Sequence, residues 1–200
     1  MSSEGRADIM IPNARLLVIS GASGSGKSTV VKHVAADSRV SPFVSISATT
    51  RSARTGEMHG REYLFLPREE FEYLIRQGEL LEWAEVHGNL YGTPAGPVLD
   101  EIGQGRLAIL EIDVQGARQV KEKVPNALFA FIHAPSMEVL ETRLRGRGTD
   151  DEAVVRKRLA NAVDEIAQAH WYDLQIVNDQ LDRTVDELVA QWSDRISRGA

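Results

Sequence analysis

A stretch near the start of the chain has the residue types and spacing of a phosphate-binding loop. Gly21-Ala-Ser-Gly-Ser-Gly-Lys27-Ser28 fits the pattern of a glycine, any four residues, Gly-Lys, and then serine or threonine. Backbone N–H groups can wrap a triphosphate closely only where few Cβ atoms intervene, so glycines are used. Lys27 can reach the β- and γ-phosphates, and the hydroxyl of Ser28 can ligate Mg²⁺. The predicted nucleotide-phosphate site consists of Gly21, Ala22, Ser23, Gly24, Ser25, Gly26, Lys27, Ser28 and Thr29.

The residues on either side of this loop supply the context that the motif needs. Residues 15–20 form an apolar run short enough for a buried strand, and residues 29–34 have apolar residues at helical spacing. A helix that starts near Lys27 would point the positive end of its dipole at a bound anion. A glycine-rich turn without function is the alternative interpretation, and the flanking strand and helix argue against it.

Strands and helices alternate through most of the chain, which predicts an α/β fold with a parallel sheet and helices on both faces. Further buried strands are predicted at 107–113, 128–133 and 174–177. Helices are predicted to start at Thr93-Pro94, Gln115 and Ser136, and at two capping boxes that begin with Thr149 and Thr184. Because the phosphate loop follows the first strand, the ligand crevice should lie at the carboxyl ends of the strands.

Residues 46–93 do not follow this alternation, and we expect them to form a small mixed lobe. Residues 61–66 alternate between polar and apolar, as a half-exposed strand does. Residues 69–77 have a helical apolar face and end at Gly78, a suitable C-cap. Two strands are expected around the turn at His87-Gly88.

The composition suits one globular domain and excludes several kinds of site. The chain has 200 residues, of which 42% are hydrophobic, and it contains no cysteine. Disulfides, zinc-thiolate sites and thiol catalysis are therefore excluded, and a cytoplasmic location is expected. We expect residues 1–13 to be a disordered tail rather than a secretory signal, and no apolar run is long enough for a membrane span.

The charge of the chain argues against nucleic acid as a partner, because the net charge is −6. Arginine makes up 18 of the 23 basic residues, and arginine suits bidentate phosphate contacts. Codon usage in a GC-rich genome explains the same bias, and composition alone does not separate the two. None of the 5 histidines lies in a metal-binding spacing, and we expect His87 and His133 to be structural.

Beyond the phosphate loop, the chain resembles guanylate kinase from about Arg15 to Val189. The segments that carry the resemblance are Ser47-Ala-Thr-Thr-Arg51-Ser-Ala-Arg54-Thr-Gly-Glu57, Leu81-Glu82-Trp83-Ala84, Gly88-Asn89-Leu-Tyr91-Gly92-Thr93, Leu110-Glu-Ile-Asp113-Val-Gln115-Gly116 and Ile176-Val177-Asn178-Asp179. The resemblance implies the fold of a P-loop nucleoside monophosphate kinase, within a single domain over 14–199. Its parts would be a parallel β-sheet core flanked by helices (14–45, 94–140 and 160–199), a small mixed α/β GMP-binding lobe (46–93) and a short lid (141–159).

The resemblance also implies an activity, which is ATP-dependent phosphorylation of GMP, and of dGMP, with Mg²⁺ assisting in-line transfer. ATP and GMP would then be the partners, with no nucleic acid and no membrane, and the oligomeric state is left open. A non-catalytic guanylate-kinase-like binding module is one alternative, and the intact Gly26-Lys27-Ser28 argues against it. A related P-loop kinase acting on a phosphorylated sugar is the other, and it should lack a guanine pocket.

The site residues that the resemblance implies fall into three groups. Those for GMP are Ser47, Arg51, Arg54, Tyr63, Glu82, Tyr91, Thr93 and Asp113, and those for catalysis are Lys27, Arg51, Arg143, Arg147 and Arg158. Asn178 belongs to the nucleotide site without a specified role. Glu82 matches the position that selects guanine, because one carboxylate can accept from both N1–H and the 2-amino group. Two arginines and two tyrosines suit the GMP phosphate.

Several of these residues keep a second interpretation. Asp113 ends a buried strand, where an acid often lies near Mg²⁺ or its waters, while the resemblance puts it near guanine. Glu111 points to the same side of that strand and is a further candidate. Arg143 and Arg147 share a helical face beside glycines that favour a moving segment, although a solvated surface is the alternative. Without the resemblance, Glu82 would be read as an ordinary exposed carboxylate.

Overall fold

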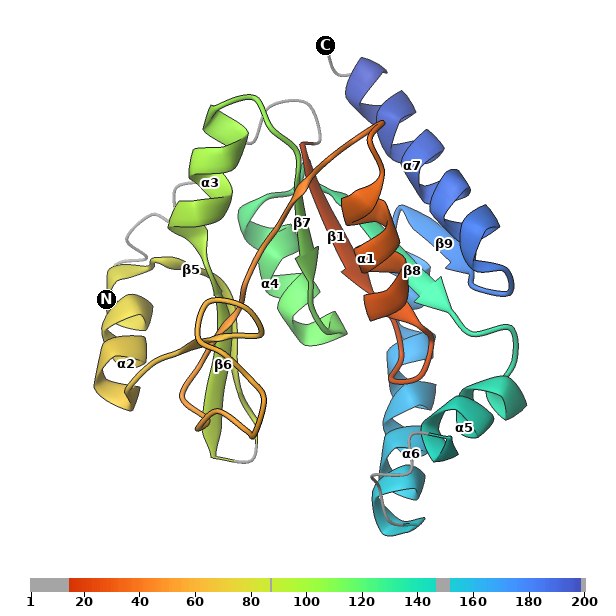
Figure 1. Cartoon of the computed structure of the whole chain (residues 1–200), viewed down its shortest axis with the longest axis horizontal. Helices are drawn as coiled ribbons and strands as arrows, with labels where there is room; N and C mark the ends of the chain where they lie inside the picture. The colour runs from red at the N-terminus through yellow and green to blue at the C-terminus, as the bar shows by residue number, and fades with distance from the viewer. Residues whose placement is uncertain (1–14, 87, 147–151, 199–200) are drawn as a thin grey trace.

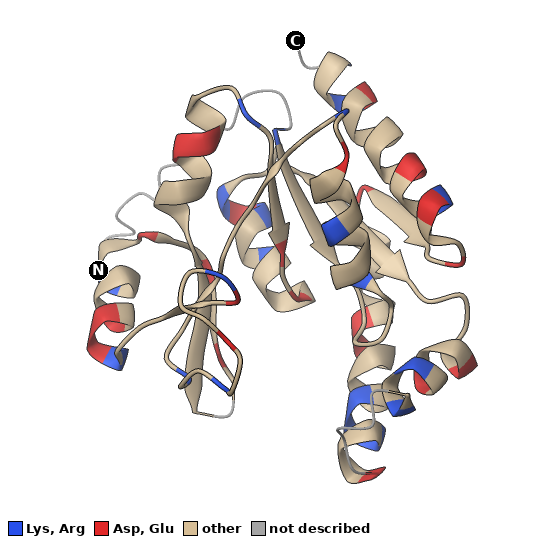
Figure 2. Cartoon of the chain, viewed as in Figure 1, with Lys and Arg blue, Asp and Glu red and all other residues tan. Residues whose placement is uncertain are grey.

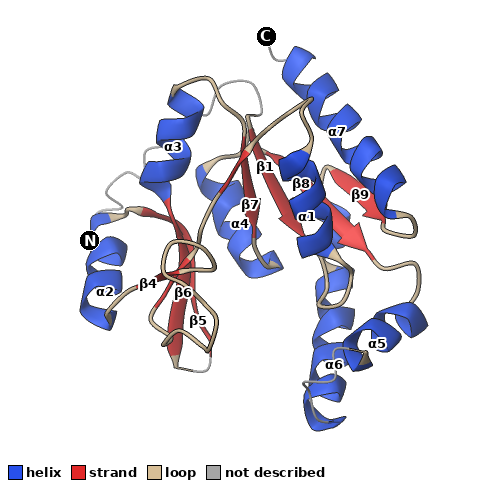
Figure 3. Ribbon diagram, in the orientation of Figure 1, coloured by secondary structure: helices blue, strands red, loops and turns tan. Residues whose placement is uncertain are grey.

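The computed structural model describes residues 15–86, 88–146 and 152–198 (Figure 1). The predicted tail, the turn residue His87, Arg147 and the capping box that begins at Thr149 lie outside these residues. Within them the strands form two sheets, one of five strands and one of four (Figure 3).

The five-stranded sheet is entirely parallel and has β1 in its centre. Its strands, in spatial order, are β2 (Phe43–Val44), β7 (Ala108–Glu111), β1 (Leu16–Ser20), β8 (Leu128–His133) and β9 (Leu174–Val177). Every residue of β1 is buried, as expected for an apolar run in the middle of a parallel sheet. The predicted α/β class with a parallel sheet is confirmed.

Helices cover both faces of this sheet, and β1 shows how the sequence divides between them. Leu16 and Val18 face the cluster that includes α3 (Ala95–Gly103) and α4 (Val114–Lys123). Leu17 and Ile19 face the cluster that includes α1 (Lys27–Ala36) and α7 (Leu181–Arg198). This alternation buries β1 on both faces between the two layers. The loop that follows β1 leaves the sheet at the carboxyl ends of the parallel strands.

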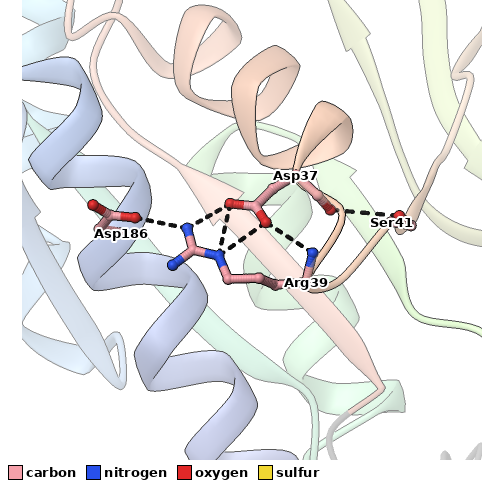
Figure 4. A network of polar contacts seen from close by, with 4 residues as sticks. All are labelled: Asp37, Arg39, Ser41 and Asp186. Carbon is pink, nitrogen blue, oxygen red and sulfur yellow. Dashed lines mark hydrogen bonds and ion pairs between the residues drawn. The ribbon is translucent and has the colours of Figure 1, made fainter.

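A polar network fastens the segment after α1 to α7 (Figure 4). The guanidinium of Arg39 donates to the carboxylate of Asp37 and, at 2.6 Å, to Asp186 of α7. These hydrogen bonds from Arg39 lower the pKa of the Asp37 carboxyl to about 2. Because Arg39 and Asp186 are exposed, the network orients the connection more than it stabilises the fold.

The four-stranded sheet forms a separate layer, seen to the left in Figure 1. Its order is β4 (Leu64–Phe65), β3 (Ala48–Thr49), β6 (Asn89–Pro94) and β5 (Leu80–Val86). The helix α2 (Arg68–Gln77) packs on it through Phe71 and ends at Gly78, whose φ of 69° confirms the predicted C-cap. The strand expected over 61–66 is reduced to the two residues of β4.

Two further helices, α5 (Met137–Arg145) and α6 (Glu152–Ala167), lie beside the phosphate loop. Ser136 caps α5, as predicted, by accepting a hydrogen bond from the N–H of Val139. Leu140 and Leu144 of α5 pack with α6 and with Ala22 of the loop. Lys and Arg gather on α5 and on the first turns of α6 (Figure 2). None of the helices within the described residues is long and apolar enough to cross a membrane.

Two predicted helix starts are wrong. The helix α7 begins at Leu181, so Thr184 lies inside it, and its hydroxyl donates to the carbonyl of Gln180 at 3.0 Å instead of capping. Thr93 and Pro94 end β6, and α3 begins only at Ala95. In both cases the residue types suit a helix start, but tertiary structure decides the boundary. Thr93 and Pro94 pair with β5, and α7 starts earlier because Leu181 packs with the core that contains Val185 and Leu188.

Candidate active site

The loop between β1 and α1 forms a hollow of about 180 Å³ lined by residues of the predicted phosphate site. Gly24 and Gly26 have φ values of 92° and 91°, a conformation that side chains with a Cβ rarely adopt. The helix α1 starts at Lys27, so its first N–H groups and its positive dipole end face the hollow. This geometry suits an anion with several oxygens.

Arg143 and Asn178 both bind the backbone of this loop. The carbonyl of Ser25 accepts from Arg143 Nη1 at 3.0 Å and from Asn178 Nδ2 at 2.9 Å. Arg143 Nη2 also donates to the carbonyl of Asn178 at 3.2 Å. A Cβ at Gly26 would lie 2.4 Å from Asn178 Nδ2, so only glycine fits there. Arg143 is therefore attached to the loop and is not a freely solvated surface residue. Arg158 lies on α6 and is half-buried.

Glu111, at the end of β7, lies against the loop residues that would contact phosphate and metal. Its Oε1 accepts a hydrogen bond from Ser28 Oγ at 2.5 Å and lies 3.5 Å from Lys27 Nζ. Asp113 differs, because its Oδ1 accepts from the N–H of Gly116 at 2.8 Å and so caps α4. The acid beside Lys27 and Ser28 is thus Glu111, which the sequence indicates only through its place on the same side of the strand as Asp113.

A cavity of about 260 Å³ lies between the end of β7 and the four-stranded sheet. It brings together residues from five different segments of the chain. Those with polar side chains are Ser47, Tyr63, Glu82, Tyr91, Glu111 and Asp113. Because Glu111 lines this cavity and also touches Ser28, the cavity and the phosphate loop are neighbours.

Glu82 is the buried acid of this cavity. It is only 7% exposed, and its Oε1 accepts a hydrogen bond from Thr93 Oγ1 at 2.6 Å. Burial raises the pKa of the Glu82 carboxyl to about 7, against the opposing effect of the Thr93 hydrogen bond. An ordinary surface carboxylate would not be buried and held in this way, so Glu82 has the character of a ligand-binding group.

The two predicted phosphate-binding arginines have different surroundings. Arg51 makes a bidentate ion pair with Glu57, with both N···O distances at 3.0 Å, and its guanidinium lies over the ring of Tyr63. The side chain of Arg54 is exposed, and only its backbone N–H donates to Glu57, at 2.8 Å. The rings of Tyr63 and Tyr91 meet edge to face at 6.0 Å. Arg51 is therefore fixed in advance, while Arg54 is free to reorient.

Glu57 is a site residue to which the sequence gives no role. Its hydrogen bond from Arg51, followed by that from the Arg54 backbone, lowers the pKa of the Glu57 carboxyl. It lies six residues from Arg51 in a turn-rich segment, where no periodicity relates the two. Apart from its place in a segment that resembles guanylate kinase, its sequence signal is that of an acid among basic residues in a polar loop.

Comparison with known proteins agrees with this geometry. The family model for guanylate kinase matches residues 13–193. The chain belongs to the guanylate kinase family. It is 50% identical to a guanylate kinase of Rubrobacter xylanophilus over 88% of this chain and 91% of that protein, and 51% identical to one of Synechocystis sp. over the same shares. The solved guanylate kinase of Anaplasma phagocytophilum is 36% identical, covers 90% of this chain and 84% of that one, and superposes with a TM-score of 0.70.

Guanylate kinases are nucleotide kinases, and such enzymes generally use Mg²⁺ with ATP. Within the described residues, no group of three or more His, Cys, Asp or Glu could hold a metal ion. Mg²⁺ in kinases typically takes one or two protein oxygens and completes its coordination with phosphates and waters. The hydroxyl of Ser28 and the carboxylate of Glu111, which are in contact here, fit that donor set.

Proposed function

We propose that this chain transfers the γ-phosphoryl group of ATP to GMP, giving ADP and GDP. The observation that carries the proposal is the buried Glu82, held by Thr93 in a cavity adjacent to the phosphate loop. Guanine presents N1–H and a 2-amino group on one edge, and an ionised carboxylate can accept from both. Adenine offers no such pair, so this site should reject it. Membership of the guanylate kinase family supports the same reaction.

The mechanism rests on position and charge. An oxygen of the GMP phosphate is already anionic near neutral pH, so no general base is required. Lys27 and the loop N–H groups would bind the β- and γ-phosphates and stabilise the charge that moves during transfer. Mg²⁺, which Ser28 and Glu111 would hold, supplies further neutralisation of phosphate charge. Closure of the surrounding segments would exclude water, which otherwise hydrolyses ATP.

The GMP phosphate would bind to two arginines and two tyrosines, namely Arg51, Arg54, Tyr63 and Tyr91. Arg51, held by Glu57, presents a pre-oriented guanidinium, and Tyr63 and Tyr91 present phenol hydroxyls beside it. Arg54 would join when GMP binds. Ser47, Thr93 and Asp113 would surround the base together with Glu82, which assigns Asp113 to guanine and leaves the metal position to Glu111.

The arginines of α5 and α6 would act on the transferred group. Arg143 is already bound to the phosphate loop, through the carbonyl of Ser25. Arg158, on α6, would approach when residues 141–159 close over ATP as a lid, with residues 46–93 closing over GMP. We extend the acceptor range to dGMP, and we place the reaction in the cytoplasm, in keeping with a chain that lacks cysteine.

A coupled assay of ADP formation tests this proposal. The protein is supplied with ATP and Mg²⁺ and with GMP, AMP, UMP or CMP as the acceptor. We expect turnover with GMP alone. Turnover with none of them, despite ATP binding, would favour a binding module or a kinase for a phosphorylated sugar, neither of which the comparisons favour.

The raised pKa of Glu82 predicts that GMP affinity depends on pH. With a pKa of about 7 in the free protein, Glu82 is protonated below neutrality and must lose that proton to accept from guanine. The KM for GMP should therefore rise about tenfold for each pH unit below 7. The phosphate of GMP titrates near pH 6, and Glu82→Gln, which keeps only that titration, is the matched control. Identical pH profiles for the two proteins would contradict the prediction.

A further inference from the structure

The strand that carries Glu82 lies at the edge of its sheet. In the order β4-β3-β6-β5, the strand β5 has β6 on one side and none of the described strands on the other. An edge strand leaves a row of peptide N–H and C=O groups without strand partners. Here the helix α4, which belongs to the other layer of the molecule, packs along that edge (Figure 1).

Two side chains of α4 bind the peptide groups on either side of Glu82. The amide of Gln119 accepts from the N–H of Trp83 at 3.2 Å and donates to its carbonyl at 2.8 Å. These are the two bonds that a neighbouring strand would make. Lys123 Nζ donates to the carbonyl of Leu80 at 2.7 Å.

The same helix also makes room for the carboxylate itself. A Cβ at Gly116 would lie 2.8 Å from Glu82 Oε2 and 3.3 Å from its Cγ. Gly116, Gln119 and Lys123 are spaced by three and four residues, so they lie on one face of α4. We call these three residues the α4 face.

The pairing of β5 with β6 does not fix Glu82 by itself. The register shifts between Leu80, which pairs with Pro94, and Glu82, which pairs with Thr93. A bulge of this kind interrupts the ladder and turns side chains in a new direction. The contacts from the α4 face flank this irregularity, because Lys123 binds Leu80 at its start and Gln119 binds Trp83, the residue directly after Glu82.

We propose that the α4 face positions Glu82 and thereby sets the preference for guanine over purines without a 2-amino group. The α4 face consists of positioning residues, because they act on the strand that carries Glu82 and not on the base. The inference rests on the proposed function, since it concerns how the acceptor base is selected. The residues that determine base specificity would then include the α4 face, which packs against β5, as well as the residues that line the cavity.

The test compares GMP with inosine monophosphate, whose base keeps N1–H but lacks the 2-amino group. Gln119→Leu removes both bonds to Trp83 with little change in side-chain size. We expect kcat/KM for GMP to fall about tenfold, because a displacement of ~1 Å can cost ~10²-fold. The preference for GMP over inosine monophosphate should fall by a similar factor, while kcat and the KM for ATP stay within about twofold.

Gln168→Leu is the matched control, since Gln168 is likewise a half-buried glutamine with two side-chain hydrogen bonds, one with the Arg118 side chain and one with the Asp164 carbonyl. It should leave the preference unchanged. Gly116→Ala is an independent variant, which pushes on Glu82 directly and should reduce the same preference. It carries the test alone if Gln119→Leu does not fold.

The outcomes separate the two proposals. A wild-type preference in Gln119→Leu and Gly116→Ala, even with a lower melting temperature, would make the α4 face merely structural and overturn the inference. A loss of preference confined to these two variants would support it. Absence of GMP turnover in the unchanged protein would overturn the proposed function, and with it this inference.

Discussion

Replacing Lys27 with alanine is expected to lower kcat by about 10²- to 10³-fold, the loss typical of removing one preorganised group that stabilises transition-state charge. Lys27 starts α1 at the phosphate loop, and its Nζ lies 3.5 Å from Glu111 Oε1. When ATP binds, its phosphates would compete with Glu111 for this cation. The alanine variant therefore loses a charge that matters most when the phosphoryl group moves.

The measurement is kcat at saturating ATP and GMP, with thermal unfolding followed in parallel. The Lys27 side chain is 20% exposed and its position at a helix N-terminus is unfavourable for a cation, so stability should change little. Lys32→Ala, an exposed lysine on the same helix, is the control and should keep wild-type turnover. Near-normal kcat in Lys27→Ala would remove Lys27 from the mechanism.

Glu82→Gln is expected to raise the KM for GMP by about 10²-fold while the KM for ATP stays nearly constant. Thr93 donates to Glu82 Oε1 at 2.6 Å, so a glutamine would turn its carbonyl oxygen toward Thr93. Its NH₂ group would then face N1–H and the 2-amino group of guanine, which are themselves donors. An unmatched donor in a buried site costs more than the loss of one hydrogen bond.

Steady-state kinetics with each nucleotide varied in turn measure this effect. Glu85→Gln provides the control, because Glu85 is an exposed carboxylate on the same strand that pairs with Arg68. It should leave both KM values near those of the wild type. Equal increases in the two KM values of Glu82→Gln would show that Glu82 does not read the base.

The parts of the fold that were predictable are those that the sequence encodes locally. The continuous apolar runs of β1 and β8 identify buried parallel strands, and Ser136 and Gly78 mark helix ends by their own chemistry. Thr184 fits a capping pattern equally well, yet α7 starts a turn earlier because Val185 and Leu188 pack into the core beside Leu181. Local pattern and packing agree in the first cases and differ in the last.

The parts of the site that were not predictable depend on contacts between distant segments. Glu111 and Asp113 are equivalent in a strand pattern, but β7 ends at Glu111, and Asp113 turns away to cap α4. The hydrogen bonds between Gln119 and Trp83 join residues 36 positions apart with no periodicity between them. The resemblance to guanylate kinase named Glu82, but only the fold shows what holds it.

The central place of β1 has a consequence for synthesis on the ribosome. Leu16 pairs with Ala108 and Leu17 with Leu128, so β1 is made before both of its neighbours and finds them only near the end of β8. At ~5–20 residues per second, this apolar strand waits roughly five to twenty seconds without its sheet partners. The four-stranded sheet, by contrast, is complete once residue 94 has been added. All strands of the base-binding sheet are therefore synthesised before the strands that flank β1 in the sheet that carries the phosphate loop.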